Sequence, residues 1–253
     1  MKGLWKCLGY ITTVFIMFAC QTHKDEKITV AVAANMQYTI KELIKAYNQQ
    51  HSATIQVVSG SSGKLTQQIL HGAPYDIFVS ADTLYPQILD QQGFTLGKPK
   101  VYAQGVLVLW SMQTDYHLDA AGAIFSDQRI KHIAIANPQT APYGQAAIAW
   151  MKSNKLYQGN EKKIVIGENI SQASQFIASG NAELGFTAKS IVLSRPLKNT
   201  GKWIELEGYP AIAQAAVQLK HAESSSTVAE SFFNFLYSDT AKKIFKQSGY
   251  LVQ

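Results

Sequence analysis

The feature of this chain that most constrains its fold is a regular alternation of short apolar runs with segments of helical periodicity. The first run, Lys27–Ala34 (KITVAVAA), is rich in β-branched residues, which is typical of a strand buried on both faces of a parallel sheet. The pattern continues, in chain order, with a helix at 37–50, a strand at 54–58, a helix through Leu65, Ile69 and Leu70, a strand at 75–80 and a helix at 82–91. Three strand–helix units in a row predict a parallel sheet covered by helices on both faces.

A second alternation follows the long apolar run at 101–110, which Gly105 interrupts. Its members are a strand at 133–136, a loop at 137–144, a helix at 145–154, a strand at 163–166, a helix at 170–178 and a strand at 182–187, followed by strands at 203–206 and 211–218 and helices at 224–237 and 240–247. We therefore expect an α/β fold of two lobes joined by a hinge. Lobe 1 is predicted to comprise residues 27–104 and 210–253, with lobe 2 (residues 105–209) inserted into it.

The N-terminus predicts export. Residues 1–19 begin with the basic Lys2 and Lys6 and continue with about a dozen apolar residues, too few to span a bilayer but typical of a secretory signal. Residues 17–20 (MFAC) resemble a bacterial lipobox, so Cys20 is predicted to be the lipidated first residue of the mature chain. The alternative is cleavage to a free periplasmic form. Either way the protein is expected in the periplasm or cell envelope.

Cysteine content and charge exclude several classes. The sequence contains only Cys7 and Cys20, so a chain without its signal has at most one cysteine and no internal disulfide. The formal charge of +6 becomes +4 when the two lysines of the signal are removed, and the remaining basic residues are scattered. Nucleic acid is therefore not an expected partner. Membrane contact is expected only through the lipid anchor, because no later apolar run is long enough to span a bilayer.

Three loops of one kind indicate the function. Each follows a predicted strand, opens a predicted helix and is rich in small or hydroxyl residues: Ala34-Asn35, residues 60–63 (GSSG) and residues 141–144 (APYG). Helix starts have unpaired N–H groups and partial positive charge, and small residues let an anion approach them closely. Each loop alone is more often a simple helix cap, Asn35 included. Together, over two lobes, they predict an anion site at the carboxyl ends of the strands.

Other chemistries fit the sequence poorly. Residues 60–64 (GSSGK) fail the phosphate-loop pattern, because Val58 occupies the position of its first glycine, and fail the GxSxG pattern, because Lys64 replaces the last glycine. The six histidines show no metal-ligand spacing. Asp76 and Asp82 flank one strand, but Asp82 is more simply a helix cap. We therefore expect no enzyme activity, no cofactor and no bound metal cation.

At these loops the sequence resembles the molybdate-binding proteins of ABC transporters over nearly all of residues 27–252. The strings that carry the resemblance are ITVAVAAN (28–35), SGSSGKLTQQILHGAPYDIFVSAD (59–82), IANPQTAPYGQAA (135–147), GENISQA (167–173), AELGFTAKS (182–190) and TAKKIFKQSGY (240–250). The resemblance implies a type II-like periplasmic-binding-protein fold. It also implies a monomeric receptor that binds molybdate or tungstate between its lobes and delivers it to the permease of an ABC importer.

The resemblance also implies a set of uncharged donors. By position, Asn35 supplies its backbone N–H and its side-chain amide, and Ser62 supplies its N–H and hydroxyl. The full set carried over is Asn35, Ser62, Tyr143 and Ile170, the last two through backbone N–H groups, with Ala34 and Ser61 as secondary candidates. Some family members place a tyrosine hydroxyl at the position of Ala188, which has none, so a donor is missing or replaced there.

Three other functions remain open on the sequence alone. The first is a receptor for another oxyanion or small acid, such as sulfate or a substituted phosphonate. The second is an enzyme and the third a regulatory sensing domain, since one bilobal fold can host all of these. The absence of a nucleophile–base set argues against the enzyme, and the export signal without a DNA-binding segment argues against the sensor.

Overall fold

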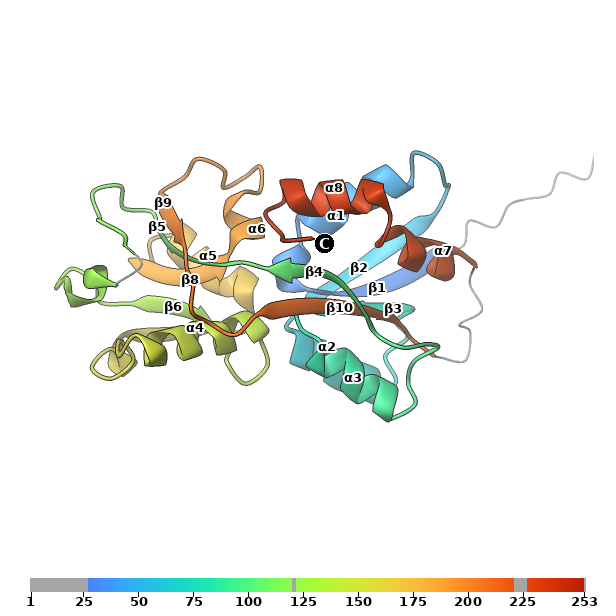
Figure 1. The fold of residues 1–253 in the computed structure, drawn as a ribbon, viewed down its shortest axis with the longest axis horizontal. Helices are drawn as coiled ribbons and strands as arrows, with labels where there is room; N and C mark the ends of the chain where they lie inside the picture. The colour runs from blue at the N-terminus through green and yellow to red at the C-terminus, as the bar shows by residue number, and fades with distance from the viewer. Residues whose placement is uncertain (1–26, 120–121, 221–226, 253) are drawn as a thin grey trace, which may run out of the picture.

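The computed structural model describes residues 27–119, 122–220 and 227–252 of the 253-residue chain. Two α/β lobes lie side by side along the long axis of the molecule (Figure 1). The predicted signal segment and Cys20 lie outside the described residues. Within the described part, no helix combines the length and apolar character that a transmembrane span requires.

Lobe 1 is built on a five-stranded sheet in the order β2-β1-β3-β10-β4. Its strands are β1 (Lys27–Ala33), β2 (Thr54–Gly60), β3 (Ile77–Val79), β4 (Lys100–Gly105) and β10 (Ile212–Gln218). β1 pairs in parallel with β2 and β3, whereas β10 is antiparallel to β3 and β4. The parallel strands therefore direct their carboxyl ends to one edge of the sheet.

Helices cover both faces of this sheet. Helices α1 (Thr39–Tyr47), α7 (Thr227–Phe235) and α8 (Asp239–Gln247) lie on one face, and α2 (Ser62–Leu70) and α3 (Leu84–Gln91) lie on the other (Figure 1). Side chains of β1 alternate accordingly. Val30 and Val32 pack in the cluster of α1, α7 and α8, and Ala31 packs in the cluster of α2 and α3. The apolar character of both faces explains why the sequence of this strand is a continuous apolar run.

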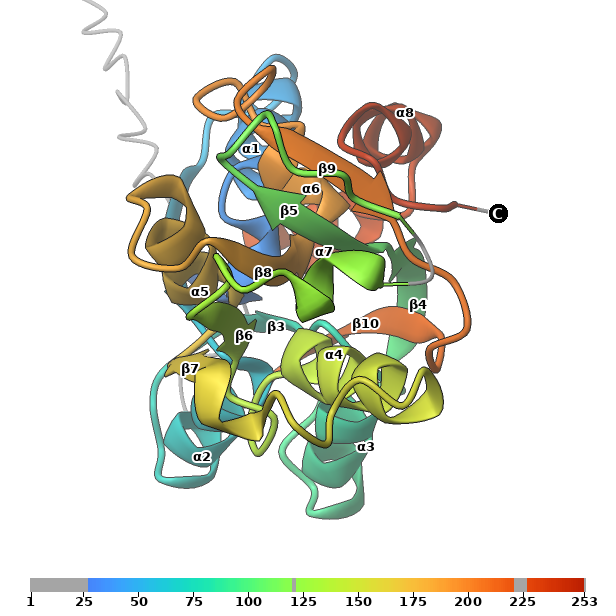
Figure 2. The same ribbon diagram turned by 90° about the vertical axis from the view of Figure 1, so that its left-hand side faces the viewer.

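Lobe 2 has the corresponding arrangement, with strand order β7-β6-β8-β5-β9. Its elements are β5 (Leu107–Ser111), η2 (Ala123–Ser126), β6 (Ile133–Ala136), α4 (Pro142–Ser153), η3 (Glu161–Lys163), β7 (Ile164–Gly167), α5 (Ile170–Ala178), β8 (Leu184–Ala188), α6 (Lys189–Val192) and β9 (Lys202–Glu205). Figure 2 shows α4 and α5 on opposite sides of β6 and β8. Trp150 of α4 packs edge-to-face on Phe186, with ring centroids 5.6 Å apart, and Trp110 packs on the α5 side.

The chain passes between the sheets twice. It leaves the first sheet at Gly105, the end of β4, and enters the second at Leu107, the start of β5. It returns between β9 and β10, over residues 206–211. The long apolar run at 101–110 is thus two strands in two sheets. The predicted α/β fold with two lobes is confirmed.

Two helix starts differ from their predictions. Asn35 was predicted to cap a helix, and this is wrong: it lies in the 3₁₀ turn η1 (Ala34–Met36), and α1 begins only at Thr39. The helix predicted from residue 145 begins at Pro142, because proline suits the first helical position, where its missing N–H costs nothing. Asp82 precedes α3, and its Oδ1 accepts a hydrogen bond from the N–H of Tyr85 at 3.2 Å, as a capping carboxylate does.

Gly144 supplies a test of how closely α4 packs on the end of β6. A Cβ at this position would overlap the carbonyl oxygen of Ala136 and lie 2.8 Å from its carbonyl carbon. We expect Gly144→Ala to lower the free energy of unfolding by about 1–3 kcal/mol, because rigid backbone must shift. Denaturant titration measures this. Gly97→Ala is the matched control, since a Cβ there meets no atom within 4 Å, and equal losses for both variants would contradict the argument.

Candidate ligand-binding site

One small buried cavity lies where the carboxyl ends of strands from both sheets meet. It is lined by Ala33, Ala34, Asn35, Gly60, Ser61, Ser62, Ala81, Ala141, Pro142, Tyr143, Asn169 and Ile170. The residues that follow β1, β2 and β3 come from lobe 1, and those that follow β6 and β7 come from lobe 2. All six residues predicted from the sequence line this cavity, and none of the six is more than 3% exposed.

Three helices begin at the cavity. Ser62 and Ile170 are the first residues of α2 and α5, and Tyr143 is the second residue of α4. Their N–H groups are therefore among those that a helix leaves without an internal partner. Asn169 caps α5, its side chain accepting hydrogen bonds from the N–H groups of Ser171 and Gln172. The positive ends of three helix dipoles consequently face one small space.

The two serines at the start of α2 have different partners. Ser62 Oγ accepts a hydrogen bond from the N–H of Ala81 at 3.0 Å, so its own proton is directed elsewhere. Ser61 is the N-cap residue of α2, but its hydroxyl makes no capping bond. Among the described residues, the buried side-chain atoms without a hydrogen-bond partner are Ser61 Oγ and Asn35 Oδ1. Both residues line the cavity, and because buried polar groups are nearly always satisfied, they indicate a polar ligand.

The lining of the cavity carries no ionisable acid or base other than the Tyr143 phenol. Burial holds the pKa of that phenol well above its usual value, so the lining stays uncharged. N–H and O–H donors in a space closed to water suit an anion, because such donors strengthen when their acceptor is charged. Within the described residues, no group of three or more His, Cys, Asp or Glu side chains could hold a metal ion.

A buried polar network lies directly beside the cavity. Asn35 Nδ2 lies 3.0 Å from both Gln214 Oε1 and Tyr250 Oη, and Gln214 Nε2 lies 3.1 Å from Tyr143 Oη. Tyr102 Oη approaches Gln214 Oε1 at 2.7 Å. Burial raises the pKa of Tyr250 to about 12 and that of Tyr102 well above its usual value, so the phenols keep their protons.

Further contacts join the lobes around the cavity. They are the hydrogen bonds Gly63 N–H to Thr140 C=O (2.9 Å), Ser171 Oγ to Gln37 Oε1 (2.8 Å) and Ser190 Oγ to Asn35 C=O (2.9 Å), and the exposed ion pair Lys64–Glu168 (2.8 Å). Around these contacts every residue of the cavity lining except Asn169 is buried. The lobes must separate for a ligand to enter or leave.

Sequence reasoning missed part of the site. Ala81, Asn169 and the residues of the network on β4, β10 and the C-terminal segment were not predicted. Ala81 and Asn169 lie inside strings that were singled out, and their places at the end of β3 and the start of α5 were available signals. Gln214 carries no such signal, because only the sheet brings it to Asn35, 179 residues earlier in the chain. Ala188 is buried at the end of β8 and is not among the residues that line the cavity.

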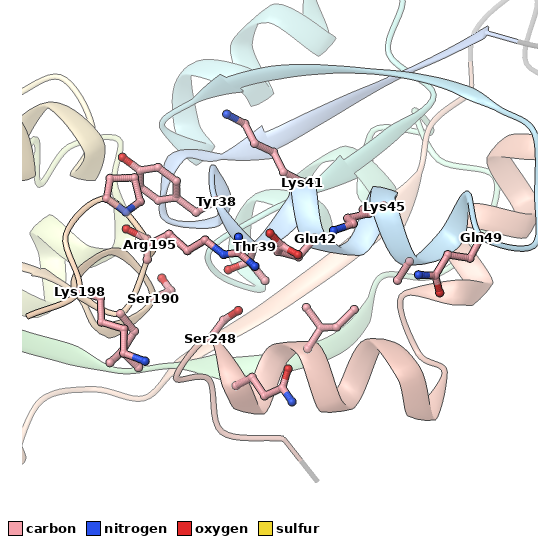
Figure 3. Close-up of a pocket in the computed structure, with 16 residues that line it drawn as sticks. Tyr38, Thr39, Lys41, Glu42, Lys45, Gln49, Ser190, Arg195, Lys198 and Ser248 are labelled. Atoms are coloured by element: carbon pink, nitrogen blue, oxygen red, sulfur yellow. The ribbon is translucent and has the colours of Figure 1, made fainter.

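A wider groove of about 630 Å³ lies at the same junction, between α1, α8 and the segment after β8 (Figure 3). Charged side chains gather along it, namely Lys41, Glu42, Lys45, Arg195 and Lys198. All five are exposed, so water screens their charges and would weaken their hold on a small ion. The enclosed cavity is therefore the candidate site.

The fold and the cavity together define a two-lobe binding protein that encloses a small polar ligand. Residues 28–251 match the family model described as bacterial extracellular solute-binding protein. The chain is 35% identical to the molybdate-binding protein ModA of Azotobacter vinelandii, over 94% of each protein. It is also 35% identical to ModA of Rhodobacter capsulatus, over 90% of this chain and 89% of that protein.

Solved structures agree with these relatives. The periplasmic molybdate-binding protein of Azotobacter vinelandii superposes with a TM-score of 0.83 at 34% identity, covering 89% of this chain and 99% of that one. The sulfate-binding protein SubI of Mycobacterium tuberculosis, at 13% identity and a TM-score of 0.72, covering 88% of this chain and 86% of that one, shares the fold alone. The chain therefore belongs to the bacterial extracellular solute-binding proteins. It is an extracytoplasmic transport receptor and not an enzyme.

Proposed function

We propose that this protein binds molybdate, and also tungstate, between its lobes and delivers it to the permease of an ABC importer. The observation that carries the proposal is an enclosed, uncharged cavity at three helix starts, with an unpaired hydroxyl and an unpaired amide atom in its lining. The two ModA relatives, both named as molybdate-binding proteins, support the choice of ligand. No cofactor is needed for this function.

The donors follow from the positions of the helix starts. Ser62 provides its backbone N–H and its hydroxyl, while Tyr143 and Ile170 provide backbone N–H groups. Asn35 provides its N–H, and Ala34 and Ser61 complete the set, Ser61 through the hydroxyl that has no protein partner. These groups come from both lobes, so closure of the lobes assembles the full set around the anion.

The chemistry of the donors explains how a dianion can be buried here. A charge removed from water without compensation is very costly, and in this cavity no cation supplies that compensation. Several charge-assisted hydrogen bonds from N–H and O–H groups do so instead. A smaller anion such as sulfate cannot reach every donor at once, and each buried donor left unmet costs about 1–3 kcal/mol. Cavity size thus provides the selectivity.

Delivery requires the cavity to open. The two crossings between the sheets, at Gly105–Leu107 and over residues 206–211, are the only connections by which the described chain passes from one lobe to the other, and they form the hinge of this proposal. The exposed Lys64–Glu168 ion pair is a weak contact that separates readily. The receptor is proposed to act as a monomer.

The choice of oxyanion is tested by calorimetric titration of the mature protein with molybdate, tungstate, sulfate and phosphate. We expect tight binding of molybdate and tungstate, with sulfate bound at least a hundredfold more weakly, equivalent to about two unmet donors. Equal affinity for sulfate would instead assign the protein to another oxyanion.

The role of the two serines is tested by single substitutions. We expect Ser62→Ala and Ser61→Ala each to weaken molybdate binding by about 1–3 kcal/mol, because each removes a donor to the anion. Only Ser62→Ala also leaves the Ala81 N–H without its acceptor, so Ser61→Ala should preserve thermal stability. Ser59→Ala, an exposed serine near the end of β2, is the control. An affinity unchanged by either substitution removes that serine from the site.

The N-terminus is proposed to carry a lipid on Cys20, which would hold the receptor at the membrane. Mass spectrometry of the protein purified from its native envelope is expected to show a mature chain that begins at Cys20 and carries acyl groups. An unmodified N-terminus, or one beyond Cys20, would show that the receptor is released into the periplasm instead.

A further inference from the structure

In the network beside the cavity, the Tyr102 phenol faces two hydrogen-bond acceptors but has only one proton. Tyr102 Oη lies 2.9 Å from the carbonyl oxygen of Ser80 and 2.7 Å from Oε1 of Gln214, and both of these atoms are acceptors. A phenol has one proton and can donate to only one of them. The other contact would place two oxygen lone pairs against each other inside a buried site, where such repulsion is not screened.

Reversal of the Gln214 amide removes the conflict. The oxygen and nitrogen of an amide are distinguished by the hydrogen bonds that they make. With its nitrogen toward Tyr102, Gln214 donates to that phenol, which then donates to Ser80 C=O. Its oxygen turns toward Tyr143 Oη, which has a proton to give, since burial holds the pKa of Tyr143 far above its usual value.

The amide of Asn35 must then reverse as well. Its atom nearest to Gln214, at 3.0 Å, now faces an N–H group and has to be an acceptor. As an oxygen it accepts from Gln214 and from the hydroxyl of Tyr250, also 3.0 Å away. Tyr250 then no longer donates to the backbone carbonyl of Asn35, 3.2 Å away, and that carbonyl keeps the hydrogen bond from Ser190 Oγ at 2.9 Å. The NH₂ group of Asn35 then takes the position of Oδ1, the amide atom that has no protein partner. In this arrangement the contact between oxygens that lacks a proton is the 3.2 Å approach of Tyr250 Oη to Asn35 C=O, which is longer and therefore less repulsive than the 2.7 Å approach of Tyr102 Oη to Gln214 Oε1 that it replaces. The NH₂ group of Asn35 is left without a protein partner, in a residue that lines the cavity.

We propose that Gln214 is a positioning residue that holds the amide of Asn35 with its NH₂ group toward the bound oxyanion. The proposal rests on the proposed function, because it requires an anion in the cavity. Orientation decides the sign of the interaction: an NH₂ group attracts a dianion, whereas an amide oxygen in the same place repels it. Gln214 thereby makes the side chain of Asn35 a hydrogen-bond donor to the anion.

The same residue connects the lobes. Gln214 lies on β10 in lobe 1 and contacts the phenol of Tyr143, on α4 of lobe 2, at 3.1 Å. Gly105, at the first crossing between the sheets, makes room for this contact, because a Cβ there would overlap both Tyr143 Oη and Gln214 Nε2. The contact can form only when the lobes are closed. Closure therefore completes the network that orients Asn35.

A double-mutant cycle on molybdate affinity tests the proposal, with Gln214→Leu and Asn35→Ala made singly and together. We expect Gln214→Leu to weaken binding about 10- to 100-fold, the range for loss of a hydrogen bond to a charged group. In the Asn35→Ala background the same change is expected to have little further effect, because Gln214 acts through Asn35. Gln218→Leu, on the same strand but half-buried, is the matched control.

Two results overturn the proposal while leaving molybdate binding by the unaltered protein intact. One is an affinity that Gln214→Leu does not change, and the other is an equal loss with and without the Asn35 side chain, which a merely structural role would cause. If no oxyanion binds the unaltered protein, the proposed function itself has failed. Gln214→Met, closer in shape to glutamine, replaces Gln214→Leu if the latter does not fold.

Nuclear magnetic resonance provides a second measurement, made first on the unaltered protein. The ¹⁵N-labelled side-chain NH₂ group of Asn35, assigned by its loss in Asn35→Ala, is expected to shift downfield and become protected from exchange when molybdate is added. In Gln214→Leu or Gln214→Met the shift is expected to shrink. An Asn35 NH₂ resonance that molybdate leaves unchanged in the unaltered protein overturns the proposal.

Discussion

Buried helix starts impose the constraint on which the rest of the structure depends. The first N–H groups of a helix have no partner within it, and their burial is costly unless another group accepts their hydrogen bonds. Here α2, α4 and α5 all begin at one cavity, where Ser62, Tyr143 and Ile170 are almost completely buried. Protein acceptors satisfy part of this demand, as Asn169 does for α5. The N–H groups that have no protein acceptor favour a negatively charged ligand that is rich in oxygen. This is the physical basis for proposing an oxyanion receptor.

The two connections between the lobes, from β4 to β5 and from β9 to β10, explain how such a ligand can be both enclosed and released. Each lobe has its own sheet, and apolar side chains pack on both faces of it. One apolar cluster continues across the junction, where Ala33, Ala34 and Ala81 of lobe 1 join the core of lobe 2. The polar contacts between the lobes are hydrogen bonds and one exposed ion pair, which water can replace when the lobes part. Tyr143 contributes both to the cavity and to the contact between the lobes. Its residue lines the cavity, and its phenol reaches Gln214 in the other lobe.

Asn35 lines the predicted site, but its local structure differs from the sequence-based prediction. An asparagine after a strand is a good helix cap, and that preference led to the wrong local prediction. In the structure a 3₁₀ turn carries the chain to α1, and the amide belongs to a network with Gln214 and Tyr250. Local propensity cannot anticipate this, because the partners are 179 and 215 residues away. The residue was correctly placed at the cavity, but its side chain performs a different task.

The sequence by itself determined the α/β class and the two lobes, because periodicity and β-branched runs are local properties. The resemblance of the sequence to a known family implied six residues that all line one cavity. The residues that the resemblance singled out were likewise marked by strings that stand next to one another in the chain. Only the tertiary structure decided that α4 begins at Pro142, that Ser62 is bonded to Ala81, and that Gln214, Tyr102 and Tyr250 surround the amide of Asn35. These contacts depend on strand order and lobe closure, which bring distant segments within hydrogen-bonding distance, and no local pattern encodes them.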